Sequence, residues 1–224
     1  MGIKEWPASE QPRQKLLTQG AQSLNDAELL AVFLRTGTHG KSAVDLGREL
    51  IKKFGNIRQL VDSSINDFLQ IKGLGNSKYV LIQASIELGR RYLETSLKQG
   101  DVFKNSVETR QYISSRLQAY PHEVFACLFL DTKHRLIRFE ELFTGTIDSS
   151  VVYPREILRR AMEHNAAAVV LCHNHPSGHP EPSHADQKLT LKLQHLLEMV
   201  DIRVLDHIIV GNAETVSFAE RGLL

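Results

Sequence analysis

The sequence predicts two architectures in one chain: a small all-helical domain in residues 1–100, followed by an α/β (α+β) domain with a mixed sheet in residues 101–224. Up to residue 97, apolar residues recur with helical spacing between glycine stops, and no strand pattern interrupts them. From residue 106, helical stretches alternate with short apolar runs in the order α, β, β, α, β, α, β, β. We therefore expect a sheet with helices packed against it in the second domain.

Composition fits a globular protein of this size. The chain has 224 residues, 42% hydrophobic and 24% charged, which is enough to bury a core in each of two domains. The net charge of +1 gives no global sign of nucleic-acid binding, so any basic patch must be local. No segment approaches the roughly 18 apolar residues of a membrane span, and the first residues lack a signal-peptide core. We expect a cytoplasmic protein with no membrane partner.

Both cysteines, Cys127 and Cys172, lie inside apolar runs that are predicted to be strands. A small buried hydrophobic residue is the expected role there, in preference to a disulfide or a metal ligand. This usage agrees with a reducing compartment.

Capping residues predict where helices of the first domain begin. Asn25 with Glu28, and Ser42 with Asp45, have the capping-box spacing and stand immediately before helical apolar patterns. The polar stretch at residues 96–105 then predicts a linker between the domains.

A Gly-Leu-Gly turn at residues 73–75 separates two predicted helices. Gly73 and Gly75 allow a tight turn, which leaves main-chain N–H groups at the start of the second helix able to hold a phosphate. The turn resembles a helix-hairpin-helix element, and Lys72 and Lys78 provide local positive charge. It predicts weak, non-specific binding to the DNA backbone. The alternative is that the turn serves only to pack the two helices.

The elements of the second domain follow from apolar periodicity and from helix-start signals. A helix runs from Ser106 to Tyr120, and a later helix has Pro154 at its first position. The expected strands lie at residues 123–131, 134–145, 166–172, 202–210 and 214–218.

A metal-ligand pattern follows the strand at residues 166–172. His173 and His175 are two residues apart, so on a strand they share a face. A rigid proline- and glycine-rich loop leads to a helix that begins at Ser183, and this places Asp186 in the first helical turn. Two imidazoles and one carboxylate, with a fourth position open, are typical of catalytic zinc. Ser183 and Asp186 also form a capping-box pair, and the two roles are compatible. We expect one Zn²⁺ per chain, held by His173, His175 and Asp186.

The run at residues 173–186 matches the pattern H-x-H-x(7)-S-x-x-D and resembles the JAMM (MPN) family of zinc metalloproteases. Further stretches resemble the bacterial RadC branch of that family; they lie at residues 13–17, 24–38, 71–75, 153–158, 173–178 and 205–211. The resemblance implies a JAMM/MPN-like fold and hydrolysis of an amide or isopeptide bond in a protein or peptide substrate by metal-activated water. It also implies an association with DNA repair.

The resemblance assigns roles to two further side chains. Glu123, the only acid where the helix at 106–120 meets the strand at 124–130, corresponds to the general base. Ser183 corresponds to a hydroxyl that aids the oxyanion. The competing glutamates nearby are Glu140, Glu141 and Glu156. The sequence departs from the family at His179, where the family more usually has an acid.

Asp206 and His207 are adjacent on a predicted strand and so face opposite ways, which argues against both binding one metal. We expect Asp206 or a backbone carbonyl to orient a ligating imidazole.

Two other functions remain open from the sequence. One is a non-catalytic DNA-binding repair or recombination accessory with a structural zinc. The other is a metal-dependent nuclease, although one zinc with one carboxylate lacks the two-metal clamp common in such enzymes.

Overall fold

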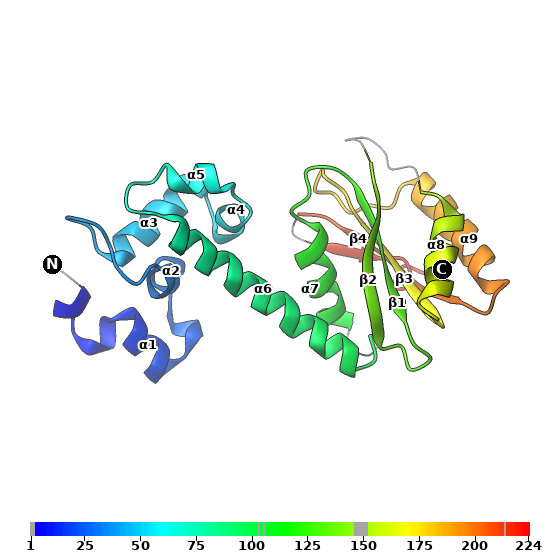
Figure 1. Cartoon of the computed structure of the whole chain (residues 1–224), viewed down its shortest axis with the longest axis horizontal. Helices are drawn as coiled ribbons and strands as arrows, with labels where there is room; N and C mark the ends of the chain where they lie inside the picture. Colours follow the sequence, from blue (N-terminus) through cyan, green and yellow to red (C-terminus); the bar gives the residue numbers. More distant parts are fainter. Residues whose placement is uncertain (1–2, 103, 105, 146–151, 213) are drawn as a thin grey trace. The chain divides into compact units, whose positions relative to one another are not determined.

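Helix α6 (Asn76–Gln99) contains the boundary between the two compact units of the chain, which divide between Leu88 and Gly89 (Figure 1). The computed structural model describes residues 3–102, 104, 106–145, 152–212 and 214–224. Each unit has a hydrophobic core of its own, and the two are described separately below.

The described part of the N-terminal unit is helical. Its elements are the 3₁₀ turns η1 (Ile3–Glu5), η2 (Ala8–Glu10) and η3 (Ala21–Ser23), then α1 (Pro12–Gln19), α2 (Asp26–Leu34), α3 (Ala43–Phe54), α4 (Ile57–Val61), α5 (Ile65–Leu69) and the first part of α6. Asn25 and Ser42 cap α2 and α3 through reciprocal bonds with Glu28 and Asp45, so both predicted helix starts are confirmed.

The Gly-Leu-Gly turn joins α5 to α6 and packs against the segment that follows α2. Gly73 has φ +91°, and a Cβ atom there would lie 1.7 Å from the Thr38 Cγ2 atom. Leu74 is buried in the core of the unit. The Lys78 ammonium donates to the backbone carbonyls of Gly73 (2.9 Å) and Thr36 (3.1 Å), which ties the turn to the neighbouring segment.

The C-terminal unit contains α7 (Ser106–Leu117), β1 (Val124–Leu130), β2 (Leu136–Thr144), α8 (Pro154–Glu163), β3 (Ala168–Asn174), α9 (His184–Glu198), β4 (Arg203–Val210) and β5 (Thr215–Ser217). The sheet order is β2-β1-β3-β4-β5. Strands β3 and β4 are parallel and the other pairs are antiparallel, so the sheet is mixed, as predicted. Residues 146–151, within the predicted segment that leads to α8, lie outside the described residues.

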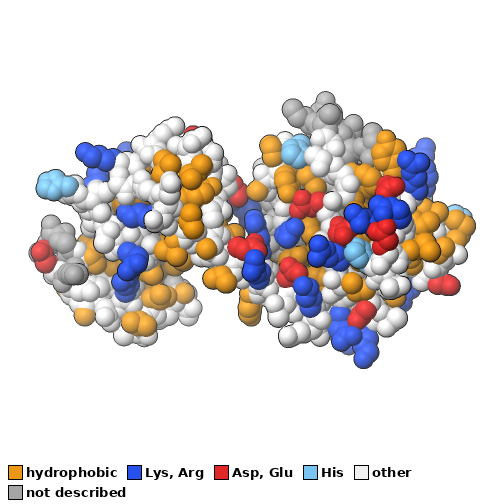
Figure 2. Space-filling model, in the orientation of Figure 1, with side chains coloured by type: hydrophobic (Ala, Val, Ile, Leu, Met, Phe, Trp, Pro, Cys, Tyr) orange, Lys and Arg blue, Asp and Glu red, His pale blue; other side chains and the backbone are white. Residues whose placement is uncertain are grey.

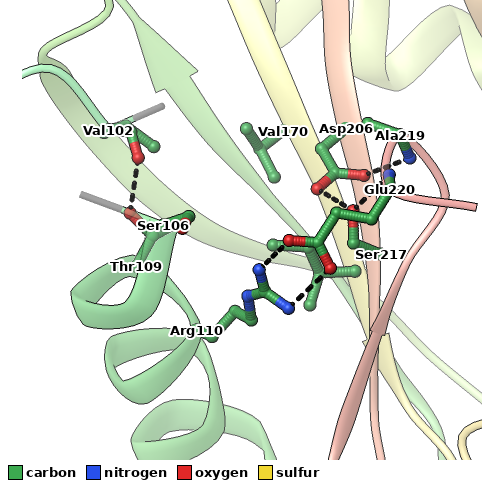
Figure 3. Close-up of a pocket in the computed structure, with 10 residues that line it drawn as sticks. Val102, Ser106, Thr109, Arg110, Val170, Asp206, Ser217, Ala219 and Glu220 are labelled. Atoms are coloured by element: carbon green, nitrogen blue, oxygen red, sulfur yellow. Dashed lines mark hydrogen bonds and ion pairs between the residues drawn. The ribbon is translucent and has the colours of Figure 1, made fainter. Parts of the chain in front are cut away.

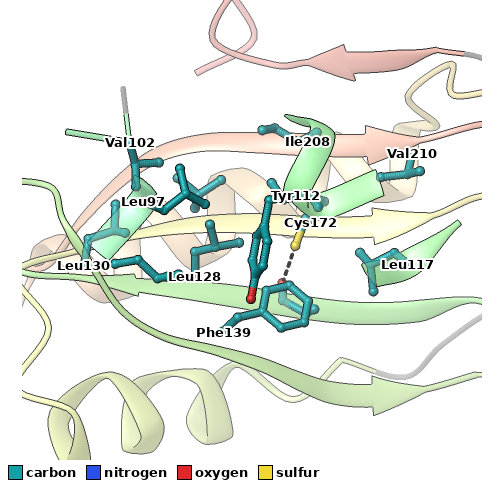
Figure 4. Close-up of a cluster of buried hydrophobic side chains, with 14 of the residues drawn as sticks. Leu97, Val102, Tyr112, Leu117, Leu128, Leu130, Phe139, Cys172, Ile208 and Val210 are labelled. Atoms are coloured by element: carbon teal, nitrogen blue, oxygen red, sulfur yellow. Dashed lines mark hydrogen bonds between the residues drawn. The ribbon is translucent and has the colours of Figure 1, made fainter. Parts of the chain in front are cut away.

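Helix α7 lies against one face of the sheet, and α8 and α9 cover the other (Figure 1). Strands β1 and β3 are buried along their whole length because both faces are covered. On the α7 face, Tyr112 packs edge-on against Phe139 over the aliphatic side chains of the central strands (Figure 4). The two cysteines are free and buried, as predicted, and burial raises the pKa of both thiols. Cys127 and Cys172 lie on opposite faces of the sheet.

The interpretation of residues 96–105 as a linker is wrong, because the described apolar residues of this stretch are buried. Residues 96–99 belong to α6, and both Leu97 and Val102 are buried in the core on the α7 face (Figure 4). The polar residues between these two side chains dominate the composition of the stretch and conceal its buried positions.

Charged side chains of both signs are interspersed on the face of the C-terminal unit drawn in Figure 2. Arg159 of α8, for example, pairs with Glu156 at 2.9 Å and with Glu163. Exposed pairs of this kind contribute little to stability. None of the described helices is long and apolar enough to cross a membrane.

The turn at residues 73–75 gives a test of how tightly the helical unit is packed. We expect Gly73→Ala to lower the free energy of unfolding of this unit by about 1–2 kcal/mol or more, because a side chain at positive φ is strained and its Cβ would meet Thr38. Gly75→Ala is the matched control, since no heavy atom lies within 4 Å of a Cβ there, and we expect a change within about 0.5 kcal/mol. Chemical denaturation measures both. Equal effects of the two substitutions would contradict this packing.

Candidate metal centre

The end of β3 brings the two histidines of the motif together. The His173 and His175 Nε2 atoms are 2.9 Å apart. His175 lies one residue beyond β3, but its N–H donates to the Val210 carbonyl at 2.9 Å, which continues the pairing with β4 by one residue. The alternation of a strand therefore persists through His175 and keeps both rings on the same side.

Asp186, in the first turn of α9, completes a cluster of three side chains. Its Oδ1 atom lies 3.4 Å from the His173 Nε2 atom, and its Oδ2 atom lies 3.7 Å from the His175 Nε2 atom. One ligand atom from each residue lies within 4.8 Å of the other two, a grouping that could hold a metal ion.

Ser183 caps α9 and holds the Asp186 carboxylate. Its backbone N–H and its hydroxyl donate to Asp186 Oδ2 at 2.8 and 2.6 Å, and its Oγ accepts from the Asp186 N–H at 3.1 Å. Burial alone would raise the pKa of Asp186, but His175, His173 and the bonds from Ser183 hold it well below its usual value. The cap occupies Oδ2 and leaves Oδ1 facing His173, so the capping and ligand roles are compatible.

A backbone carbonyl orients the His175 ring, as predicted. The Nδ1 atom of His175 lies 2.8 Å from the His179 carbonyl oxygen, which can only accept, so Nδ1 carries a proton. The Nε2 atom therefore faces His173 and Asp186. The hydrogen bond with Asp186 raises the pKa of His175 above its ordinary value, against the opposing effect of burial.

A third histidine, His207, orients the His173 ring. The His173 Nδ1 atom lies 2.8 Å from the His207 Nε2 atom, deep in the core. Burial lowers the pKa of His173 to about 4, so the ring is neutral at ordinary pH. Asp206, the alternative to a backbone carbonyl in that expectation, does not perform this task, because its side chain lies on the other face of the sheet.

On that other face, Asp206 lines a cavity of about 170 Å³ beneath α7 (Figure 3). Its carboxylate accepts hydrogen bonds from the Ser217 hydroxyl (2.7 Å) and the Ala219 N–H (3.0 Å). An ion pair between Arg110 and Glu220 lies at the edge of the cavity (Figure 3). Burial raises the pKa of Asp206. The described partners of this carboxylate secure the C-terminal segment to β4.

Glu123 immediately precedes β1, and its backbone carbonyl accepts from the Gly145 N–H at 2.9 Å. The negative charge of its carboxylate contributes to the raised pKa of His175, after the larger effects of Asp186 and of the His179 carbonyl. The competing glutamates have partners elsewhere: Glu140 contacts His164 and Arg160, Glu141 contacts Tyr120 and Arg116, and Glu156 contacts Arg159.

Asn174, between the two histidines, is a residue that the sequence interpretation missed. Its side-chain oxygen accepts from the Val124 N–H at 2.8 Å, and its amide donates to the carbonyls of His122 (3.0 Å) and Tyr120 (3.3 Å). These bonds attach the segment that carries Glu123 to the strand that carries the candidate metal ligands. Strand alternation signals only that Asn174 points away from the histidines; its partners lie about 50 residues earlier in the chain.

The residues predicted to contact DNA all lie in the N-terminal unit. Lys72 and Gly75 are exposed, and the space in front of Gly75 is open. Lys78 donates to two backbone carbonyls, and partial burial lowers its pKa. Position 73 requires glycine, because a Cβ atom there would overlap the Thr38 side chain. Binding of DNA by this turn stays a prediction.

Comparison with known proteins gives the class of protein. Residues 103–223 match the model of the RadC-like JAB domain, and residues 3–80 match the UPF0758 N-terminal model. The chain is similar over its full length to UPF0758 proteins of Nitrosococcus oceani (58% identical) and Thioalkalivibrio sulfidiphilus (57%), covering 100% of each. The UPF0758 protein of Marinobacter nauticus is 55% identical, also over 100% of both chains.

This chain therefore belongs to the UPF0758 family, with a RadC-like JAB domain as its C-terminal part. The predicted RadC resemblance and JAMM/MPN-like fold class are confirmed.

Asn174 provides a stability test of the site. We expect Asn174→Leu to lower the free energy of unfolding of the C-terminal unit by at least about 2 kcal/mol, because each buried group left without a partner costs about 1–3 kcal/mol. Gln118→Leu is the control, since it removes one amide bond, to the Asn212 carbonyl, at an exposed position. Equilibrium denaturation compares both with the wild type. If Asn174→Leu proved as stable as Gln118→Leu, the role of Asn174 in attaching the Glu123 segment to β3 would be refuted.

Proposed function

We propose that the C-terminal unit is a zinc-dependent hydrolase that cleaves an amide or isopeptide bond in a protein or peptide substrate. The observation that carries this proposal is the convergence of the His173 and His175 Nε2 atoms and Asp186 Oδ1 on one place at the edge of the sheet.

The residues fit a zinc ion on chemical grounds. The Nε2 atoms of His173 and His175 are 2.9 Å apart, and the Nδ1 atom of each ring contacts another group. The lone pairs of the two Nε2 atoms repel each other unless a cation or a proton lies between them. Two imidazole nitrogens and one carboxylate oxygen are a ligand set of catalytic zinc, with the fourth position open. Buried His173 contributes a neutral nitrogen, which is the form that binds metal.

A bound zinc ion would polarise the substrate carbonyl and lower the pKa of a water molecule. Glu123 would accept a proton from the attacking water and return it to the leaving nitrogen. Asn174 holds the start of β1 against β3 and so fixes the distance from Glu123 to the ligands. The Ser183 hydroxyl donates to Asp186 in this structure, so it would have to rotate toward the substrate to aid an oxyanion.

The same ligand set argues for carbonyl chemistry over phosphodiester cleavage. Among the described residues there is one cluster of three metal-ligating side chains, and it contains a single carboxylate. Nucleases that use metal ions commonly hold a pair of them about 4 Å apart, with more carboxylates.

Metal content tests the ligands. We expect purified full-length protein to bind one zinc ion, and His175→Ala to lose it while keeping the fold, because the core of the unit lies behind the site. His179→Ala is a matched control in the same loop. It removes an exposed side chain but keeps the backbone carbonyl that orients His175, so zinc should remain. Metal analysis and circular dichroism are the measurements. Equal zinc content in wild type and His175→Ala would exclude these ligands.

Glu123→Gln separates catalysis from metal binding. The amide has nearly the shape of the acid but cannot accept the proton, so zinc content should be unchanged while kcat/KM falls by at least about 100-fold. A proteome-wide comparison of new protein termini, wild type against Glu123→Gln, would identify a substrate for the assay. Near-normal turnover in the variant would place the base elsewhere, with Glu156 the next candidate; loss of zinc would make Glu123 a ligand.

A further inference from the structure

His207 is a buried histidine for which the proposed reaction assigns no step. It lies on β4 with no exposed surface, and its ring stacks on Phe218 with centroids 4.7 Å apart and meets Phe125 edge-on at 5.7 Å. A core histidine surrounded by aromatic rings could serve packing alone. The hydrogen bonds of its two ring nitrogens indicate a more specific role.

The first of these bonds fixes which nitrogen of His207 carries the proton. Thr190 Oγ1 lies 2.6 Å from the backbone carbonyl of Asp186, one helical turn earlier in α9, and 2.6 Å from His207 Nδ1. The carbonyl can only accept, so the single hydroxyl proton of Thr190 is donated to Asp186. The hydroxyl oxygen must then accept from His207, whose Nδ1 is therefore protonated.

The second bond transmits this choice to the metal centre. The His207 ring has no exposed surface, and such burial favours its neutral form, so a proton on Nδ1 leaves Nε2 as an acceptor. The His173 Nδ1 atom lies 2.8 Å away and must donate to it. The remaining nitrogen of His173, Nε2, then has a free lone pair directed at His175 and Asp186.

We propose that Thr190 and His207 are positioning residues that select the metal-binding tautomer of His173. The inference rests on the proposed function in one respect, that His173 Nε2 is a zinc ligand. We call the chain of hydrogen bonds from the Asp186 carbonyl through Thr190 and His207 to His173 the relay. Asp186 takes part at both of its ends, since its backbone carbonyl accepts from Thr190 while its carboxylate faces His173. The first turn of α9 thus sets the carboxylate ligand and the tautomer of the histidine ligand together.

Thr190→Val removes the hydroxyl with little change of volume. His207 would then have no acceptor at Nδ1, and it could carry its proton on Nε2 and donate to His173 Nδ1. That arrangement moves the His173 proton to Nε2, where it blocks the metal. Partners of this kind typically change metal affinity by about 10–100-fold.

The experiment uses full-length protein in four forms: wild type, Thr190→Val, Thr190→Ser and Thr109→Val. Thr109 is the matched control, because it is also a buried helical threonine whose hydroxyl donates to a backbone carbonyl, that of Val102, but on the α7 face. Proton–nitrogen NMR of the imidazole rings in metal-free protein reports the tautomers, with His173→Gln to assign the signals. Competition with a zinc chelator gives the zinc dissociation constants.

We expect the wild type to show His173 protonated at Nδ1 and Thr190→Val to shift the proton toward Nε2, with zinc bound about 10–100-fold more weakly. Thr190→Ser should restore both properties, and Thr109→Val should leave both unchanged. An unaltered tautomer in Thr190→Val, or equal loss of zinc affinity in Thr190→Val and Thr109→Val, would overturn the relay. A wild type with the expected tautomer but no zinc affinity would support the relay and refute the proposed function instead.

Discussion

The parallel pairing of β3 with β4 is the constraint on which the rest of the site depends. Parallel neighbours cannot be joined by a tight turn, so the chain must leave the end of β3, cross one face of the sheet and return to the start of β4. Helix α9 makes this crossing, and its first turn therefore lies near the end of β3. The two histidines, Asp186, Thr190 and His207 all come from this one strand–helix–strand unit.

The alternation of the central strands assigns the polar groups of the unit to two separate tasks. On the face covered by α8 and α9, His173 and His207 meet and form the inner side of the candidate metal centre. On the α7 face, Asp206 secures the C-terminal segment beside a small cavity. Asn174 also points away from the histidines and attaches the Glu123 segment to β3. Polar groups one residue apart therefore do not compete for the same partners.

Burial sets the electrostatics of the centre. An imidazole without solvent resists protonation, so His173 keeps a neutral nitrogen for a cation. The carboxylate of Asp186 stays ionised because its hydrogen bonds and neighbouring imidazoles outweigh the desolvation that favours the protonated form. A neutral donor beside an anionic donor suits a divalent cation, and the helix cap at Ser183 holds the anionic donor in place.

Local chemistry in the sequence was sufficient for the helix caps, the strand order along the chain and the three candidate ligands. A capping box acts over three residues and a His-x-His pair over two, so both can be recognised without knowledge of the fold. Contacts between distant segments could not be recognised in this way. The partners of Asn174, the choice of His207 over Asp206 beside His173, and the burial of Leu97 and Val102 depend on which strands pair and which helix covers each face. Only tertiary packing decides these, because an imidazole or an amide accepts many partners and the fold determines which of them comes within about 3 Å.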